Sequence, residues 1–134
     1  MYRKILIAYN HAARMGKRIE YIVVHDTGNP RSGADAYAHY RYFSQPGRNA
    51  SAHYFVDSKE VIQTVEDHKA AWHCGDGRGR YGITNSNSIG VELCINLDGD
   101  WEETKSRGIV LIRELMSKHS IPKERVVRHF DASG

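Results

Sequence analysis

Cysteine and proline are scarce in this sequence. Its 134 residues include two cysteines and three prolines. Cys74 and Cys94 do not form a Cys-X-X-Cys pair, so zinc-finger spacing is excluded, and in a reducing compartment we expect both to be free thiols. The prolines fall at breaks between periodic segments, and the sequence has no internal repeat. We therefore expect a single domain over residues 1–134.

Long hydrophobic runs are missing as well. The longest apolar run near the start covers residues 5–8, far less than a signal-peptide core or a membrane span requires. The sequence therefore predicts no membrane span and no ordinary signal peptide, and we expect synthesis in the cytoplasm. A chain of this length can bury about two-thirds of its unfolded surface, so we expect a monomer that folds without disulfides.

A strong charge of one sign is also absent. There are 19 basic and 16 acidic residues, which gives a net charge of +3. This excess is too small and too dispersed to indicate a nucleic-acid-binding surface. The glycine-rich segment 75–80 lacks the Gly-Lys-Ser/Thr ending of a P-loop and does not join a strand to a helix, so a nucleotide-phosphate site is excluded.

Hydrophobic periodicity predicts the order of the elements. Strands are expected over 21–25, 52–56, 61–65 and 89–95, with the second and third forming a hairpin, and helices over 36–43 and about 101–120. Ser32 is expected to cap the first helix and Asp100 the second. Residues 1–18 are interpreted as an arm lying on the domain. This order predicts an α/β domain with a central mixed β-sheet flanked by α-helices.

Histidine, in contrast, is abundant, with eight residues. His25 ends the first predicted strand, and His129 follows the apolar pair Val126-Val127. Glu92 lies on its strand face opposite the apolar residues, where burial would raise its pKa toward the range of a general base. These three groups are components of a hydrolytic zinc site. The pattern alone favours structural histidines, however, and leaves Glu92 equally open to a buried ion pair.

Four other histidines carry no such signal. Their positions are typical of surface or helix-edge residues, and we expect no role in a site for His11, His39, His68 and His119.

Five segments together resemble one protein family. They are residues 21–29 (YIVVHDTGN), 51–56 (SAHYFV), 71–77 (AWHCGDG), 87–93 (NSIGVEL) and 128–134 (RHFDASG). In this order they resemble the zinc-dependent N-acetylmuramoyl-L-alanine amidases of type 2, a family that includes bacteriophage endolysins, bacterial autolysins and peptidoglycan-recognition proteins. The resemblance covers residues 20–134.

The resemblance implies roles for five residues. His25 and His129 match two zinc ligands, in a groove at one face of the sheet. Glu92 matches the catalytic acid of the endolysin and autolysin branches. His53 stands where some relatives carry a tyrosine near the metal, which makes it a candidate for substrate binding. His73 falls in the loop block that lines the substrate groove, and substrate contact and loop packing are both open for it.

The sequence departs from the family pattern at its C-terminus. Relatives continue past the last segment with a lysine that stabilises the oxyanion and a cysteine or aspartate that is the third zinc ligand, and we expect both beyond Gly134. Cys74 and Cys94 do not stand at the matching position. Either the chain is truncated within its C-terminal motif and belongs to a longer endolysin, in which a wall-binding domain can follow, or it is a non-catalytic binding module.

The activity implied is a zinc-dependent hydrolysis in bacterial peptidoglycan. The bond cut would be the amide between N-acetylmuramic acid and L-alanine, and the enzyme would act on the cell wall after release from the cytoplasm. A phage or prophage endolysin fits this expectation, and an intracellular muropeptide-recycling amidase is a further alternative. A module that binds muropeptide through the same groove without cutting it is the alternative from another class.

Overall fold

The computed structural model describes residues 2–74 and 80–133, so most of the glycine-rich segment lies outside the described residues. Within these ranges the strands are β1 (Arg3–Lys4), β2 (His11–Ala13), β3 (Tyr21–Asp26), β4 (Tyr54–Val56), β5 (Val61–Gln63), β6 (Lys69–Ala71), β7 (Ser88–Leu93) and β8 (Val126–Arg128). The α-helices are α1 (Ala36–Phe43), α2 (Trp101–His119) and α3 (His129–Ser133), and the 3-10 helices are η1 (Arg80–Gly82), η2 (Asn85–Asn87) and η3 (Lys123–Arg125).

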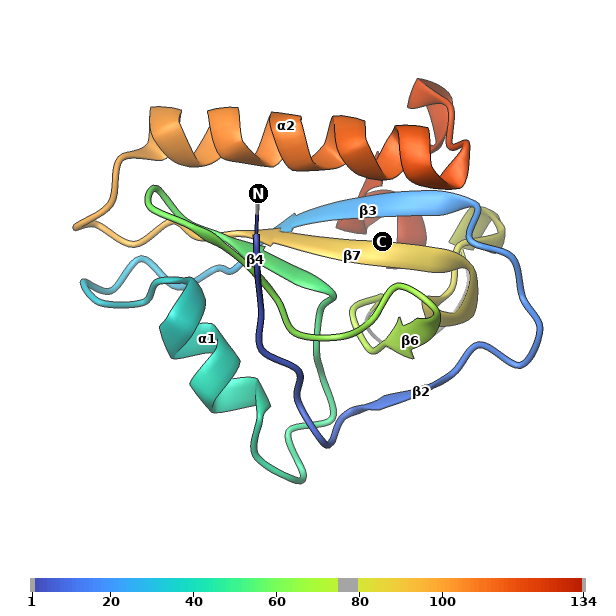
Figure 1. Cartoon of the computed structure of the whole chain (residues 1–134), viewed down its shortest axis with the longest axis horizontal. Helices are drawn as coiled ribbons and strands as arrows, with labels where there is room; N and C mark the ends of the chain where they lie inside the picture. The colour runs from blue at the N-terminus through green and yellow to red at the C-terminus, as the bar shows by residue number, and fades with distance from the viewer. Residues whose placement is uncertain (1, 75–79, 134) are drawn as a thin grey trace.

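Six of these strands form one mixed sheet in the order β1-β5-β4-β7-β3-β8, and β2 pairs with β6 in a small second sheet. Strands β4, β7, β3 and β8 are parallel to one another, whereas β4 and β5 form the predicted antiparallel hairpin. Helix α2 covers one face of the sheet, and α1 lies on the other (Figure 1). The predicted class, a mixed sheet flanked by helices, is confirmed.

Side-chain alternation assigns the two faces of the central strands. Ile22, Ile89 and Val91 point to the α2 side, where they pack against Leu111 and Leu115 in the largest buried cluster. The neighbouring positions on β3 and β7 point to the opposite face, because successive side chains of a strand alternate. That opposite face carries the polar residues that the sequence singled out.

Both long helices begin at acidic caps. The Asp100 carboxylate accepts a hydrogen bond from the Glu103 amide, as expected, and α2 ends where Ser120 adopts a left-handed conformation with φ of 55°. The expected cap of α1 at Ser32 is wrong. Gly33 has a φ of 87°, which no helical first turn permits, and Asp35 is the cap, accepting from the Ala38 amide.

The N-terminal arm does lie on the domain, but it also contributes two short strands. Strand β1 adds to the sheet edge beside β5, and β2 pairs with β6. The sequence did not indicate β6, because a strand of three residues is too short to show periodicity.

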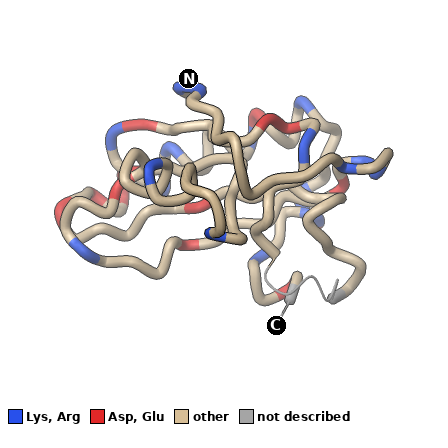
Figure 2. Tube along the Cα trace, turned by 90° about the horizontal axis from the view of Figure 1, so that it is seen from below, with Lys and Arg blue, Asp and Glu red and all other residues tan. Residues whose placement is uncertain are grey.

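Figure 2 shows Lys and Arg interspersed with Asp and Glu along the trace. Within the described ranges, no helix combines the length and the apolar character that crossing a membrane would need.

Candidate functional site

Strand register brings His25 beside Glu92. Strands β3 and β7 are parallel, and His25 pairs with Glu92 while Phe55 of β4 pairs with Glu92 from the other side. In-register residues of adjacent strands project from the same face of a sheet. The three side chains therefore form one row on the face opposite α2.

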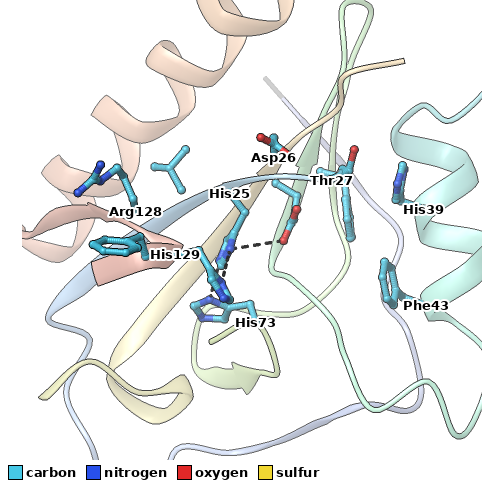
Figure 3. A pocket seen from close by; sticks show the side chains of 12 residues that line it. His25, Asp26, Thr27, His39, Phe43, His73, Arg128 and His129 are labelled. Atoms are coloured by element: carbon cyan, nitrogen blue, oxygen red, sulfur yellow. Dashed lines mark hydrogen bonds and ion pairs between the residues drawn. The ribbon is translucent and has the colours of Figure 1, made fainter. Parts of the chain in front are cut away.

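The C-terminal segment brings His129 to the same row. Strand β8 pairs with β3 so that Arg128 stands opposite Val24, and His129 follows as the first residue of α3. The Nδ1 atom of His129 lies 3.0 Å from Nδ1 of His25, and Oε2 of Glu92 lies 3.8 Å from the same His25 atom. The structure thus brings together the three residues that the sequence selected, and Figure 3 shows His25 and His129 facing each other.

A pocket of about 610 Å³ opens above this row. Helix α1 supplies His39 and Phe43 on one side, and the C-terminal segment supplies Arg128 and His129 on the other (Figure 3). A pocket of this volume, with polar groups converging on it, can hold a substrate the size of a small peptide or sugar.

Two histidines of the pocket, His25 and His73, are uncharged at neutral pH. Burial, with a contribution from the neighbouring His129, lowers the pKa of His25 to about 3. Burial, with the neighbouring His25 contributing, lowers the pKa of His73 well below its ordinary value. A neutral imidazole is the form that binds a metal ion.

Glu92 has the opposite shift. Burial, reinforced by the nearby Asp26 carboxylate, raises its pKa to about 8. A carboxyl group that titrates near neutral pH can both accept and return a proton. The alternative of a buried ion pair lacks support, because the His25 imidazole beside Glu92 is neutral.

His73 lines the pocket and also packs against His25. Its ring lines the pocket, yet it is only 6% exposed, and its Nδ1 lies 3.1 Å from His25 Nε2. Most of its surface is therefore committed to packing against the site rather than open to a substrate.

His53 lies apart from the pocket described above. The side chain is completely buried; its Nδ1 accepts from the Gly90 amide, and its Nε2–H donates to the Lys69 carbonyl. Arg14 Nη2 lies 3.2 Å from Nε2, but both groups are then donors, so this contact is not a hydrogen bond. Burial lowers the pKa of His53 to about 4. The neutral ring ties β7 to β6.

The expectation for His39 is wrong. This histidine is buried and lines the pocket, with its ring stacked on Phe55 at 5.5 Å and on Phe43 at 6.4 Å between centroids. Its Nδ1–H donates to the Asp35 carbonyl, so Nε2 is the second polar atom of the ring. The four-residue spacing to Phe43 indicated a shared helix face and was the available signal.

Two imidazoles of this site fit a zinc ion. Nitrogens bound to tetrahedral zinc at 2.0–2.1 Å lie roughly 3.3 Å apart, close to the 3.0 Å between the Nδ1 atoms of His25 and His129. Within residues 2–74 and 80–133, however, no three His, Cys, Asp or Glu side chains are grouped so that they could hold a metal ion.

Known proteins resemble the chain in sequence. The family model described as N-acetylmuramoyl-L-alanine amidase matches residues 15–134. The N-acetylmuramoyl-L-alanine amidases CwlH and XlyA of Bacillus subtilis (strain 168) are each 42% identical over 114 residues, 85% of this chain. These matches cover 45% of CwlH and 37% of XlyA, so the chain spans less than half the length of these relatives.

Solved structures resemble the chain in fold. The catalytic domain of XlyA superposes with a TM-score of 0.86 at 37% identity, covering 96% of this chain and 84% of that domain. The E. coli amidase AmiD, solved with a substrate that joins anhydro-N-acetylmuramic acid to a peptide, gives a TM-score of 0.67 at 25% identity, covering 86% of this chain and 49% of AmiD. The chain belongs to the N-acetylmuramoyl-L-alanine amidase family.

Proposed function

We propose that this chain is the catalytic domain of a zinc-dependent N-acetylmuramoyl-L-alanine amidase that acts on bacterial peptidoglycan. The observation that carries the proposal is the convergence of His25, His129 and Glu92 in one pocket. The bond cut is the amide between N-acetylmuramic acid and L-alanine, which is the bond named in the family description. The cell wall is accordingly the place of action.

His25 and His129 are the proposed zinc ligands. Their Nδ1 atoms lie 3.0 Å apart, and burial keeps the His25 imidazole uncharged. A bound zinc ion supplies Lewis acidity, which makes water a better nucleophile at neutral pH and polarises a carbonyl group.

Glu92 is the proposed acid and base. Its carboxylate takes a proton from the attacking water and returns it to the departing alanine nitrogen, and a pKa near neutrality suits both transfers. His39 and Phe43, on the α1 wall, orient the substrate through a ring nitrogen and an apolar ring. We place substrate contact there and at the exposed edge of His73 rather than at the buried His53.

The third zinc ligand and the oxyanion-stabilising lysine are proposed to follow Gly134 in a longer protein, in which a wall-binding domain can follow. The incomplete ligand set of the described residues supports this proposal, as does the greater length of CwlH and XlyA. The alternative is a module that binds muropeptide without cutting it. The sequence that the gene encodes after Gly134 distinguishes the two proposals. A lysine and a cysteine or aspartate soon after Gly134 would support the enzyme, and their absence would support the binding module.

Removal of zinc tests the proposal. A protein that extends past Gly134 is expected to release new alanine amino termini from purified peptidoglycan. Treatment with a chelator should reduce release to the background rate, and added zinc should restore it, because two imidazoles and a third ligand hold the metal reversibly. The 134-residue chain is the control and should hold zinc weakly.

Two outcomes would contradict the assignment. Chelator-resistant release of alanine termini would exclude zinc dependence. Tight, stoichiometric zinc in the 134-residue chain would show that the ligand set needs nothing beyond Gly134.

A further inference from the structure

A line of buried hydrogen bonds leads from a backbone carbonyl to His25. The Ser88 hydroxyl lies 2.5 Å from the Thr84 carbonyl oxygen, and Ser88 Oγ lies 3.0 Å from His73 Nε2. His73 Nδ1 then lies 3.1 Å from His25 Nε2. Ser88 and His73 are buried, so bulk water does not compete for these bonds.

The direction of the bonds follows from what each atom can donate. A carbonyl oxygen only accepts, so the Ser88 hydroxyl donates to Thr84 and has only lone pairs left for His73. His73 must therefore carry its proton on Nε2. A neutral imidazole has one N–H, so His73 Nδ1 accepts. His25 Nε2 lies nearer to it, at 3.1 Å, than the weakly donating Cys74 thiol, at 3.6 Å, so the proton that His73 Nδ1 accepts is on His25 Nε2. The Nδ1 atom of His25 is left with a lone pair that faces His129.

Glycine at position 90 makes this arrangement possible. A Cβ atom on Gly90 would lie 2.4 Å from Cγ of the His73 ring, closer than any side chain tolerates. The ring of His73 thus rests directly on the backbone of β7, between Ser88 on the same strand and His25 on the next.

We propose that Ser88 and His73 are positioning residues that hold His25 in the tautomer with Nδ1 unprotonated. The reverse tautomer would point an N–H at His129 and could not bind a metal through Nδ1. Partners of this kind orient metal-binding histidines in general. The consequence for zinc rests on the proposed function, whereas the tautomer itself does not.

The tautomer is tested on the metal-free 134-residue chain. Nitrogen-15 NMR of the histidine rings should show that His25 and His73 both carry their proton on Nε2. Ser88→Ala removes the acceptor, so both rings should shift toward mixed tautomers. Thr104→Val is the matched control: it deletes another buried hydroxyl that donates to a carbonyl, that of Asp100 on α2, and should leave both tautomers unchanged. A protonated Nδ1 on wild-type His25, or unchanged tautomers in Ser88→Ala, would overturn the proposal.

Zinc affinity is the second measurement, made on a protein that extends past Gly134. Ser88→Ala is expected to weaken zinc binding by about 10–100-fold, and Gly90→Ala, which displaces the His73 ring, should do the same with Ser88 intact. Thermal melts exclude unfolding as the cause. Wild-type affinity in a folded Ser88→Ala protein would overturn the positioning role. Failure of every variant and of the wild type to bind zinc would instead refute the proposed function, while NMR still decides the tautomer.

Discussion

Replacement of Glu92 by glutamine should lower the rate of alanine release by about 10²–10⁴-fold, the usual contribution of a general acid–base group. Glutamine has nearly the same shape but can neither take a proton from water nor return one to the leaving nitrogen. The measurement is the release of alanine amino termini from peptidoglycan by a protein that extends past Gly134. Glu114→Gln, on helix α2, is the control and should retain the wild-type rate.

The same substitution should raise stability, which separates lost chemistry from lost folding. Burial and the nearby Asp26 raise the pKa of Glu92 from 4.5 to about 8, so the folded protein binds a proton that the unfolded chain releases. Between these two pH values wild-type stability falls as the pH rises, and glutamine removes this loss. The melting temperature of Glu92→Gln should exceed that of the wild type at pH 8 and match it near pH 4. A variant that keeps full activity would refute the assigned role.

Replacement of Asp67 by alanine should destabilise the fold by about 3–5 kcal/mol, the range for breaking a buried charged network. Its carboxylate accepts hydrogen bonds from Tyr54 Oη at 2.6 Å, His119 Nε2 at 2.8 Å and Lys118 Nζ at 3.2 Å. These bonds tie the end of α2 to β4 and to the β5–β6 connection. Removal of the carboxylate leaves the Tyr54 hydroxyl buried without its partner.

The stability lost in Asp67→Ala should depend on pH and disappear in acid. Burial alone would raise the pKa of Asp67, but the hydrogen bonds from Tyr54, His119 and Lys118 outweigh it and hold the pKa below 3.8. The stabilisation is therefore present above pH 3.8 and is lost as the pH falls below it. Urea unfolding of wild type and Asp67→Ala should show a gap that closes in acid.

The neighbouring glutamate provides the control for Asp67. Glu66 forms an exposed ion pair with Lys4, and Glu66→Ala should change the free energy of unfolding by less than about 1 kcal/mol. Equal effects of Glu66→Ala and Asp67→Ala would show that the buried network contributes no more than a surface pair.

Local patterns in the sequence were sufficient to predict the fold class and the family. A run of β-branched and aromatic residues located β3. Alternation located β7, and helical spacing with Asp100 as cap located α2, because these elements are long enough to repeat their period. The pattern also placed Glu92 on the face away from the apolar core. The ends of apolar segments marked His25 and His129 as candidates, but their expected role as zinc ligands came from the family resemblance, since nothing in their spacing links them.

Other features depend on contacts between segments that are distant in the chain. Parallel register sets His25 beside Glu92, and the pairing of β8 with β3 delivers His129. His39 enters the pocket because Phe43 and Phe55 stack against it, and His53 is drawn into the interior by backbone partners on two strands.

The line of buried hydrogen bonds from Thr84 through Ser88 and His73 to His25 also depends on contacts between segments that are distant in the chain. Each residue has an ordinary sequence context, and the direction of its hydrogen bonds follows only from which atoms face each other. The sequence by itself therefore determined the longer elements, the family and the three groups that we propose do the chemistry. The tertiary structure decided which histidines line the pocket and which nitrogen of His25 faces it, because side-chain environment is a property of long-range packing and not of local order.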